Sequence, residues 1–181
     1  MEREVTFAGF GGQGVMTAGK FLAQGAMNNG MEVAWVPSYG PEMRGGTAYC
    51  TVVIADEAVG SPIVRNPETV VVMNRPSLDK FASEVRPGGC LIINSSLIDV
   101  VSDRTDIMVM TVPCNQISMD VTGTGRYAGA VPVVDYTSIE NVVKTKFGKK
   151  PQVLENILRI MRMGYEAGVK ARAEYEAKKG A

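Results

Sequence analysis

The stretch that decides the fold is Val5-Thr6-Phe7-Ala8-Gly9-Phe10-Gly11-Gly12-Gln13-Gly14, which VMTAGKFLAQGAMNN follows at residues 15–29. Residues 5–8 form a short apolar run typical of a buried strand, and residues 9–14 match the pattern GxGxxG. Residues 15–29 predict a helix that ends at Gly30. Residues 32–36 predict a second strand that stops before Pro37. This strand–helix–strand order favours an α/β fold with a mostly parallel sheet and right-handed crossovers.

Later segments extend this pattern without an internal repeat. Four β-branched or aliphatic stretches predict further strands, at residues 47–55, 69–73, 90–93 and 107–112. Helices are predicted after Pro76, at residues 138–146 behind a Thr137/Glu140 capping box, and at residues 151–181 as a C-terminal helix with a charged tail. The pattern predicts no structure for residues 123–137. We therefore expect residues 1–181 to form a single Rossmann-like, three-layer domain.

Charge and composition restrict the classes of partner. Nineteen basic and 19 acidic residues give a formal net charge of zero, which removes the electrostatic drive behind most binding to nucleic acid or to anionic membranes. The chain starts with the charged residues Met-Glu-Arg-Glu, and no apolar run is long enough to span a membrane. We expect a cytoplasmic protein that binds neither nucleic acid nor membrane.

The residues that usually carry catalysis or metals are scarce. The chain has no histidine, which excludes Ser–His and Cys–His nucleophiles and histidine metal sites. Its three cysteines, Cys50, Cys90 and Cys114, lie far apart in apolar surroundings, which favours buried small hydrophobic residues over a zinc or iron–sulfur site. We predict no catalytic residue and no metal ligand in this chain.

The glycine turn is the first candidate binding site, with Gly9, Gly11, Gly12, Gln13 and Gly14 as candidate cofactor-binding residues. Glycines allow close backbone approach, and the N-terminus of the following helix attracts a phosphate. A tight turn without a ligand is the alternative. A dinucleotide site also needs an acidic residue at the end of the second strand, but Glu32 lies at the start of that strand. The hypothesis of a nicotinamide cofactor therefore lacks the ribose-binding acid. Binding of the diphosphate of another cofactor is still a possible role of the glycine turn.

A second candidate loop follows the second strand. Its candidate binding residues are Ser38, Tyr39, Gly40, Arg44, Gly45 and Gly46. We expect the first two strands to be parallel neighbours, which would place this loop beside the glycine turn at the carboxyl edge of the sheet. Arg44 is then either an anion clamp or the partner of Glu42 in a surface ion pair. Asn74 and Asn94 also follow predicted strands, and we interpret them as helix caps rather than ligand contacts.

Five segments together resemble one known family. They are GFGGQGVMTAGKFLA at 9–23, PSYGPEMRGG at 37–46, GSPIV at 60–64, MNRPSLDKF at 73–81 and GGCLIINSSLI at 88–98. In this order they are similar to the gamma subunits of 2-oxoacid:ferredoxin oxidoreductases. The combination of GPEMRGG and MNRPSLDKF resembles the 2-oxoglutarate or branched-chain (2-ketoisovalerate) type, with 2-oxoglutarate as the expected substrate. The match thins at Arg126-Tyr127-Ala128, where relatives carry an Asn-Met-rich helix.

The resemblance implies a division of labour among subunits. Thiamine diphosphate with Mg, held between alpha and beta subunits, would decarboxylate the 2-oxoacid. The electrons would pass through iron–sulfur clusters on other subunits and a ferredoxin-like delta subunit. Coenzyme A would accept the acyl group. This chain has no GDG…NN signature and no cluster cysteines, so we expect it to bind no cofactor firmly and to be inactive alone. It would support the complex, with coenzyme A as the candidate ligand of the glycine turn and Arg44.

Two other readings stay open. One is a free-standing nucleotide-binding dehydrogenase, against which the missing ribose-binding acid and the absent histidine argue. The other is an interaction module whose glycine turn packs against a partner and binds no ligand.

Overall fold

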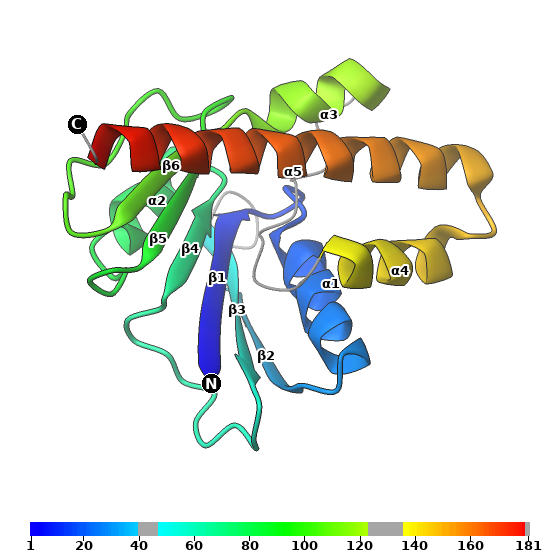
Figure 1. Ribbon diagram of the computed structural model, residues 1–181, viewed down its shortest axis with the longest axis horizontal. Coiled ribbons are helices and arrows are strands. Elements are labelled where there is room, and N and C mark those ends of the chain that lie inside the picture. Colours follow the sequence, from blue (N-terminus) through cyan, green and yellow to red (C-terminus); the bar gives the residue numbers. More distant parts are fainter. Residues whose placement is uncertain (40–46, 123–135, 180–181) are drawn as a thin grey trace.

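The computed structural model describes residues 1–39, 47–122 and 136–179 (Figure 1). The elements in chain order are β1 (Glu2–Phe10), α1 (Val15–Asn28), β2 (Glu32–Tyr39), β3 (Thr47–Ala55), β4 (Thr69–Val72), α2 (Arg75–Phe81), β5 (Cys90–Asn94), β6 (Met108–Val112), α3 (Cys114–Thr122), α4 (Tyr136–Phe147) and α5 (Pro151–Lys179).

The strands form one sheet in the order β2-β3-β1-β4-β5-β6. The pairs β1–β4, β4–β5 and β5–β6 are parallel, whereas β3 runs antiparallel to both of its neighbours, β1 and β2. All described strands except β3 therefore point the same way. The predicted α/β class with a mostly parallel sheet and a C-terminal helix is confirmed.

One expectation about the sheet is wrong, because β1 and β2 are not neighbours. Strand β3 lies between them, and its Cys50 pairs with Phe7 on one side and Pro37 on the other. Strands β2 and β3 are joined through residues 40–46 and pair as an antiparallel hairpin. The run Cys50–Ala55 is wholly buried, which suits a central strand, while β2 contains a proline and takes the edge.

Helices cover both faces of the sheet and make the three predicted layers. On one face α1, α3, α4 and α5 enclose the larger core, whose buried members include Phe7, Leu22, Ile139 and Ile160. On the other face Leu78 and Phe81 of α2 pack on the alternate strand residues. Figure 1 shows α5 crossing over β6 at one end of the sheet, with α1 and α4 side by side at the other.

Several element boundaries differ from the sequence prediction. Helix α3 was not predicted at all. Helix α4 begins at Tyr136, two residues before the predicted start at residue 138. Helix α5 remains helical through the charged segment to Lys179. No helix in the described ranges is both long and apolar enough to cross a membrane.

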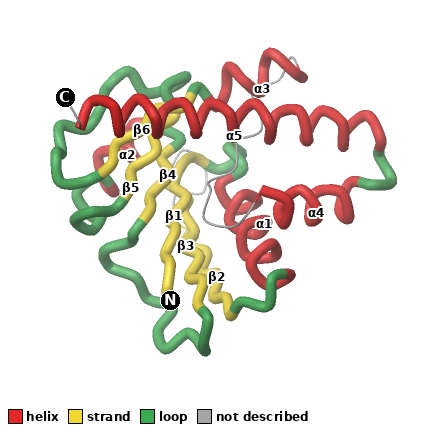
Figure 2. The backbone as a smooth tube through the Cα atoms, in the orientation of Figure 1, coloured by secondary structure: helices red, strands yellow, loops and turns green. Residues whose placement is uncertain are grey.

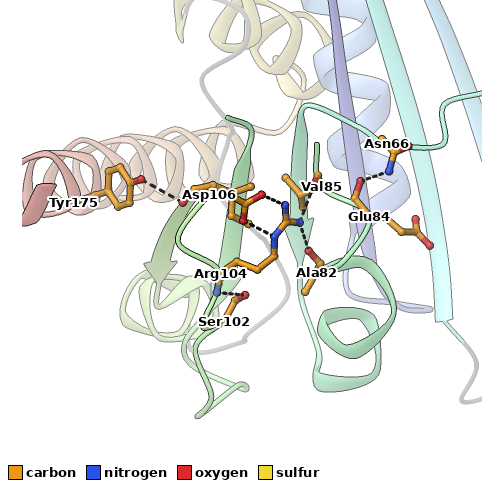
Figure 3. Close-up of polar contacts among 9 residues, drawn as sticks. Asn66, Ala82, Glu84, Val85, Ser102, Arg104, Asp106 and Tyr175 are labelled. Atoms are coloured by element: carbon orange, nitrogen blue, oxygen red, sulfur yellow. Dashed lines mark hydrogen bonds and ion pairs between the residues drawn. The ribbon is translucent and has the colours of Figure 1, made fainter. Parts of the chain in front are cut away.

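Two long connections without helix or strand are fixed by polar contacts. The connection from β3 to β4 lies beside the N-terminus (Figure 2), where the Met1 amino group forms an ion pair with Asp56 at 2.7 Å. The connection from β5 to β6 is fixed by Arg104, whose Nη1 donates to the carbonyl oxygens of Ala82 and Val85 at 2.9 and 2.7 Å (Figure 3). The Arg104 Nε donates to the carboxylate of Asp106 at 2.9 Å.

Candidate functional site

The glycine turn joins the carboxyl end of β1 to the first turn of α1. The Gln13 N–H donates to the Phe10 carbonyl oxygen at 3.2 Å and closes the turn. Gly12 and Gly14 have φ angles of 91° and 81°, a region that side-chain-bearing residues rarely adopt. Two of the glycines are therefore required by backbone conformation.

Gly9 and Gln13 have packing roles within the turn. A Cβ atom on Gly9 would lie 2.7 Å from the Gln13 Oε1 and 2.9 Å from the Met73 Cβ, so only glycine fits. The Gln13 Oε1 accepts a hydrogen bond from the Phe10 N–H at 2.6 Å, and its Nε2 donates to the Met73 carbonyl oxygen at 3.3 Å. Gln13 thus ties the turn to the end of β4.

Side-chain amides continue along this edge of the sheet. The Asn74 Oδ1 accepts from the Ser77 N–H at 2.9 Å and caps α2, and the Asn94 Oδ1 accepts from the Cys114 N–H at 3.1 Å at the start of α3. The capping interpretation of both residues is confirmed. Asn94 also donates from its Nδ2 to the Asn115 Oδ1 at 2.7 Å. Sequence reasoning missed Asn115, because its position depends on the unpredicted helix α3.

The amino end of α1 is open to an anion. Its N-cap is Gly14, which makes no side-chain hydrogen bond to the first turn, and that turn carries no acidic residue. The amide groups at the start of a helix have no intrahelical acceptor and carry partial positive charge. Gly11 and Gly12 are exposed in front of them. Gly11, unlike Gly12 and Gly14, does not have a positive φ angle.

The second loop starts at the same edge. Ser38 and Tyr39 are the last residues of β2, Tyr39 pairs with Ala48, and Phe10 at the end of β1 pairs with Thr47. The carboxyl ends of β1 and β2 therefore flank the start of β3, so the two loops leave one edge, as predicted, but are separated by β3. Gly40, Arg44, Gly45 and Gly46 lie outside the described residues, as does the alternative Arg44–Glu42 pair.

The cysteines do not form a metal site. None of the three cysteines forms a disulfide; Cys50 and Cys114 are buried and Cys90 is partly exposed. Burial raises the pKa of both Cys50 and Cys90 to about 11, which keeps the thiols protonated at neutral pH. In the parts of the chain that the structure describes, no three His, Cys, Asp or Glu side chains are grouped as a metal would require.

Comparison with known proteins agrees with this architecture. Residues 4–167 match the family described as pyruvate ferredoxin/flavodoxin oxidoreductase. The chain belongs to this family.

Relatives within the pyruvate ferredoxin/flavodoxin oxidoreductase family are subunits of oxidoreductases. Ketoisovalerate oxidoreductase subunit VorA of Methanothermobacter marburgensis is 38% identical over 173 residues, which are 90% of this chain but only 36% of VorA. The 2-oxoglutarate synthase subunit KorC of the same organism is 32% identical over 153 residues, covering 81% of this chain and 82% of KorC.

A solved structure has the same fold. The gamma subunit of the keto/oxoacid ferredoxin oxidoreductase from Geobacter sulfurreducens PCA superimposes with a TM-score of 0.79 at 23% identity, covering 93% of this chain and 99% of that subunit. This structural match shows the fold, and the predicted family resemblance is confirmed by the family match together with the identity to VorA and KorC.

Proposed function

We propose that this chain is the gamma-type subunit of an enzyme that oxidatively decarboxylates a 2-oxoacid, transfers the acyl group to coenzyme A and reduces ferredoxin. Its identity with VorA and KorC supports this proposal. The decarboxylation is assigned to thiamine diphosphate and Mg between the alpha and beta subunits, and electron transfer to iron–sulfur clusters on other subunits, among them a ferredoxin-like delta subunit. A cytoplasmic location belongs to the same proposal.

Within this complex, we assign to the chain the binding of the coenzyme A diphosphate at the glycine turn. The observation that carries this assignment is the uncapped amino end of α1 behind the exposed Gly11 and Gly12. A diphosphate there would accept hydrogen bonds from the first-turn amides, and close approach needs a residue without a side chain at position 11. Arg44 is the proposed second contact, as a forked donor to phosphate.

The 2-oxoacid remains a choice between two related substrates. The segments GPEMRGG and MNRPSLDKF favour 2-oxoglutarate or a branched-chain 2-oxoacid over pyruvate. The identity of 38% with a ketoisovalerate subunit, against 32% with a 2-oxoglutarate subunit, favours the branched-chain substrate, whereas our expectation from the sequence was 2-oxoglutarate. Rates of the assembled complex with 2-oxoglutarate, 2-ketoisovalerate and pyruvate distinguish the three.

The nicotinamide-dehydrogenase alternative has less support than coenzyme A binding. In the dinucleotide fold, the second strand lies next to the first and carries the acid that binds the ribose. Here the antiparallel β3 takes that place, and Glu32 lies at the opposite end of β2. A comparison of NAD, ADP and coenzyme A binding to the full chain tests this alternative directly.

The decisive experiment is Gly11→Asp in the assembled complex. The new carboxylate would occupy the place of the anion, so we expect the coenzyme A concentration needed for half-maximal rate to rise at least tenfold while the subunits still assemble. Arg44→Ala should act in the same direction with a smaller effect. Gly60→Asp, in an exposed loop, is the matched control and should leave coenzyme A dependence unchanged.

Two outcomes would reject parts of the proposal. Lost assembly with unchanged coenzyme A dependence in the residual complex would mean that the glycine turn is an interface and binds no ligand. Turnover of a 2-oxoacid by the purified chain alone, with thiamine diphosphate and ferredoxin added, would reject the subunit assignment.

A further inference from the structure

Helix α5 changes character half-way along its length. Its first half buries the large side chains Ile157, Ile160 and Met161 against the core. On the same face, its second half carries four small residues, namely Gly164, Ala167, Gly168 and Ala171. Beyond them, the hydroxyl of Tyr175 donates to the Ile107 carbonyl oxygen at 3.2 Å (Figure 3). The helix is thus fixed to the rest of the fold at both ends of a small-residue segment.

A cavity of about 340 Å³ lies between this segment and the sheet. Its floor is formed by Val71, Ile92 and Met110 from the three parallel strands β4, β5 and β6. At one end it is lined by Cys90 and Arg172. Cys90 begins β5, so this end lies at the amino edge of the sheet, opposite the edge that carries the glycine turn.

The same end of the cavity faces solvent and carries charge. Arg172 and Arg3 are 64% and 46% exposed and form ion pairs with Glu176 and Glu68, respectively. Glu68 also pairs with Arg86, so two guanidinium groups balance its charge. The Arg172–Glu176 pair is exposed on both sides and contributes little free energy, so a ligand carboxylate can exchange into it.

Gly168 of α5 is not explained by packing. In α1, a Cβ on Gly19 would lie 2.5 Å from the Cys50 Sγ, so that glycine permits close approach. A Cβ on Gly168 would meet nothing within 4 Å. Glycine inside a helix lowers stability relative to alanine. At Gly168 its effect is to keep space open between the helix and the sheet.

We infer that this cavity binds a small amphiphilic acid, with its apolar body between α5 and the sheet and its carboxylate at Arg172 and Arg3. The volume lies in the range of small-molecule sites, which are mostly apolar with few polar groups. Apolar cavities bind apolar molecules of matching size. The site is separate from the proposed coenzyme A site, so either assignment can fail alone.

Calorimetric titration of the full chain with octanoate tests this inference. We expect saturable binding at one site by the wild type and at least tenfold weaker binding by Gly168→Leu, because Gly168 lines the cavity and a Cβ there meets no atom within 4 Å. Gly60→Leu adds the same side chain in an exposed loop with open space around it and should bind octanoate as the wild type does. Arg172→Gln should weaken binding of octanoate but not of 1-octanol.

Alkylation of Cys90, followed by mass spectrometry, locates the ligand. Octanoate should slow modification of Cys90 in the wild type and have no effect in Gly168→Leu. The inference is overturned if the wild type does not bind octanoate, if Gly168→Leu binds it unchanged, or if Cys90 is not protected. It is also overturned if Cys90 in the assembled complex is fully protected without octanoate, because a partner subunit would then occupy the cavity.

Discussion

Asn74 donates a hydrogen bond from its Nδ2 to the Oε1 of Gln13 at 3.3 Å, across 61 residues of sequence. The same side chain caps α2 through its Oδ1. One buried amide therefore connects the glycine turn on one side of the sheet with the helix that covers the other side.

Asn74→Ala should remove both contacts. We expect the free energy of unfolding, measured by urea titration, to fall by about 1–2 kcal/mol, the usual cost of a lost cap. Asn74→Ser keeps an oxygen that can cap α2 but is too short to reach Gln13. If the serine variant is as unstable as the alanine variant, the cap is not the source of the stability.

Alanine at two helix glycines should have opposite effects. Gly19→Ala places a Cβ 2.5 Å from the Cys50 Sγ and should lower the free energy of unfolding by about 1–3 kcal/mol through overpacking. Gly168→Ala meets no atom within 4 Å and should raise it by about 0.5–1 kcal/mol through helix propensity. Chemical denaturation of both variants measures the difference, and a destabilised Gly168→Ala would show that α5 needs glycine there for packing.

Arg104 should determine the stability of the connection from β5 to β6. Arg104→Ala leaves the carbonyl groups of Ala82 and Val85 without their charged donor, so we expect a loss of about 1–3 kcal/mol. Amide hydrogen exchange at residues 95–107 should accelerate more than exchange in α1. Asp106→Asn should lower stability less, because it removes only the exposed carboxylate partner of Arg104. Equal losses in the two variants would mean that the ion pair, and not the contacts with the carbonyl groups, stabilises the connection.

The buried thiols should make stability fall at alkaline pH. The pKa of Cys50 and of Cys90 is about 11 in the folded chain, raised by burial from a model-peptide value near 9. Protons therefore bind more tightly to the folded state, and the stabilisation is complete below pH about 9 and is lost as the pH rises through about 11. Urea titrations across this window check it. Cys50→Ala should show a smaller fall than the wild type, and an identical fall would assign the effect to other groups.

The sequence predicted the strand–turn–helix start and the cap at Asn74 because these are local features. The pattern GxGxxG after an apolar run specifies the turn, and an asparagine directly before a helix specifies the cap. Strand pairing is not local. An apolar β-branched segment such as residues 47–55 fits either side of β1, and only the hairpin with β2 places it there.

Helix α3 was missed for a different reason. Its sequence CNQISMDVT is short, largely polar and rich in residues that form helices weakly, so its few apolar residues do not by themselves indicate a helix. Its start depends on the Asn94 Oδ1, which comes from a strand 20 residues earlier.

The central place of β1 has a consequence for synthesis of the chain. Its hydrogen-bonding neighbours are β3 and β4, so β1 gains its second partner only after β4 has left the ribosome. The pairing of β2 with β3 is local in sequence, so this hairpin can form before β1 pairs with β4. Until Val72 has emerged, the apolar segment from Val5 to Ala8 has an unsatisfied edge, and the nascent chain is open to aggregation or chaperone capture there.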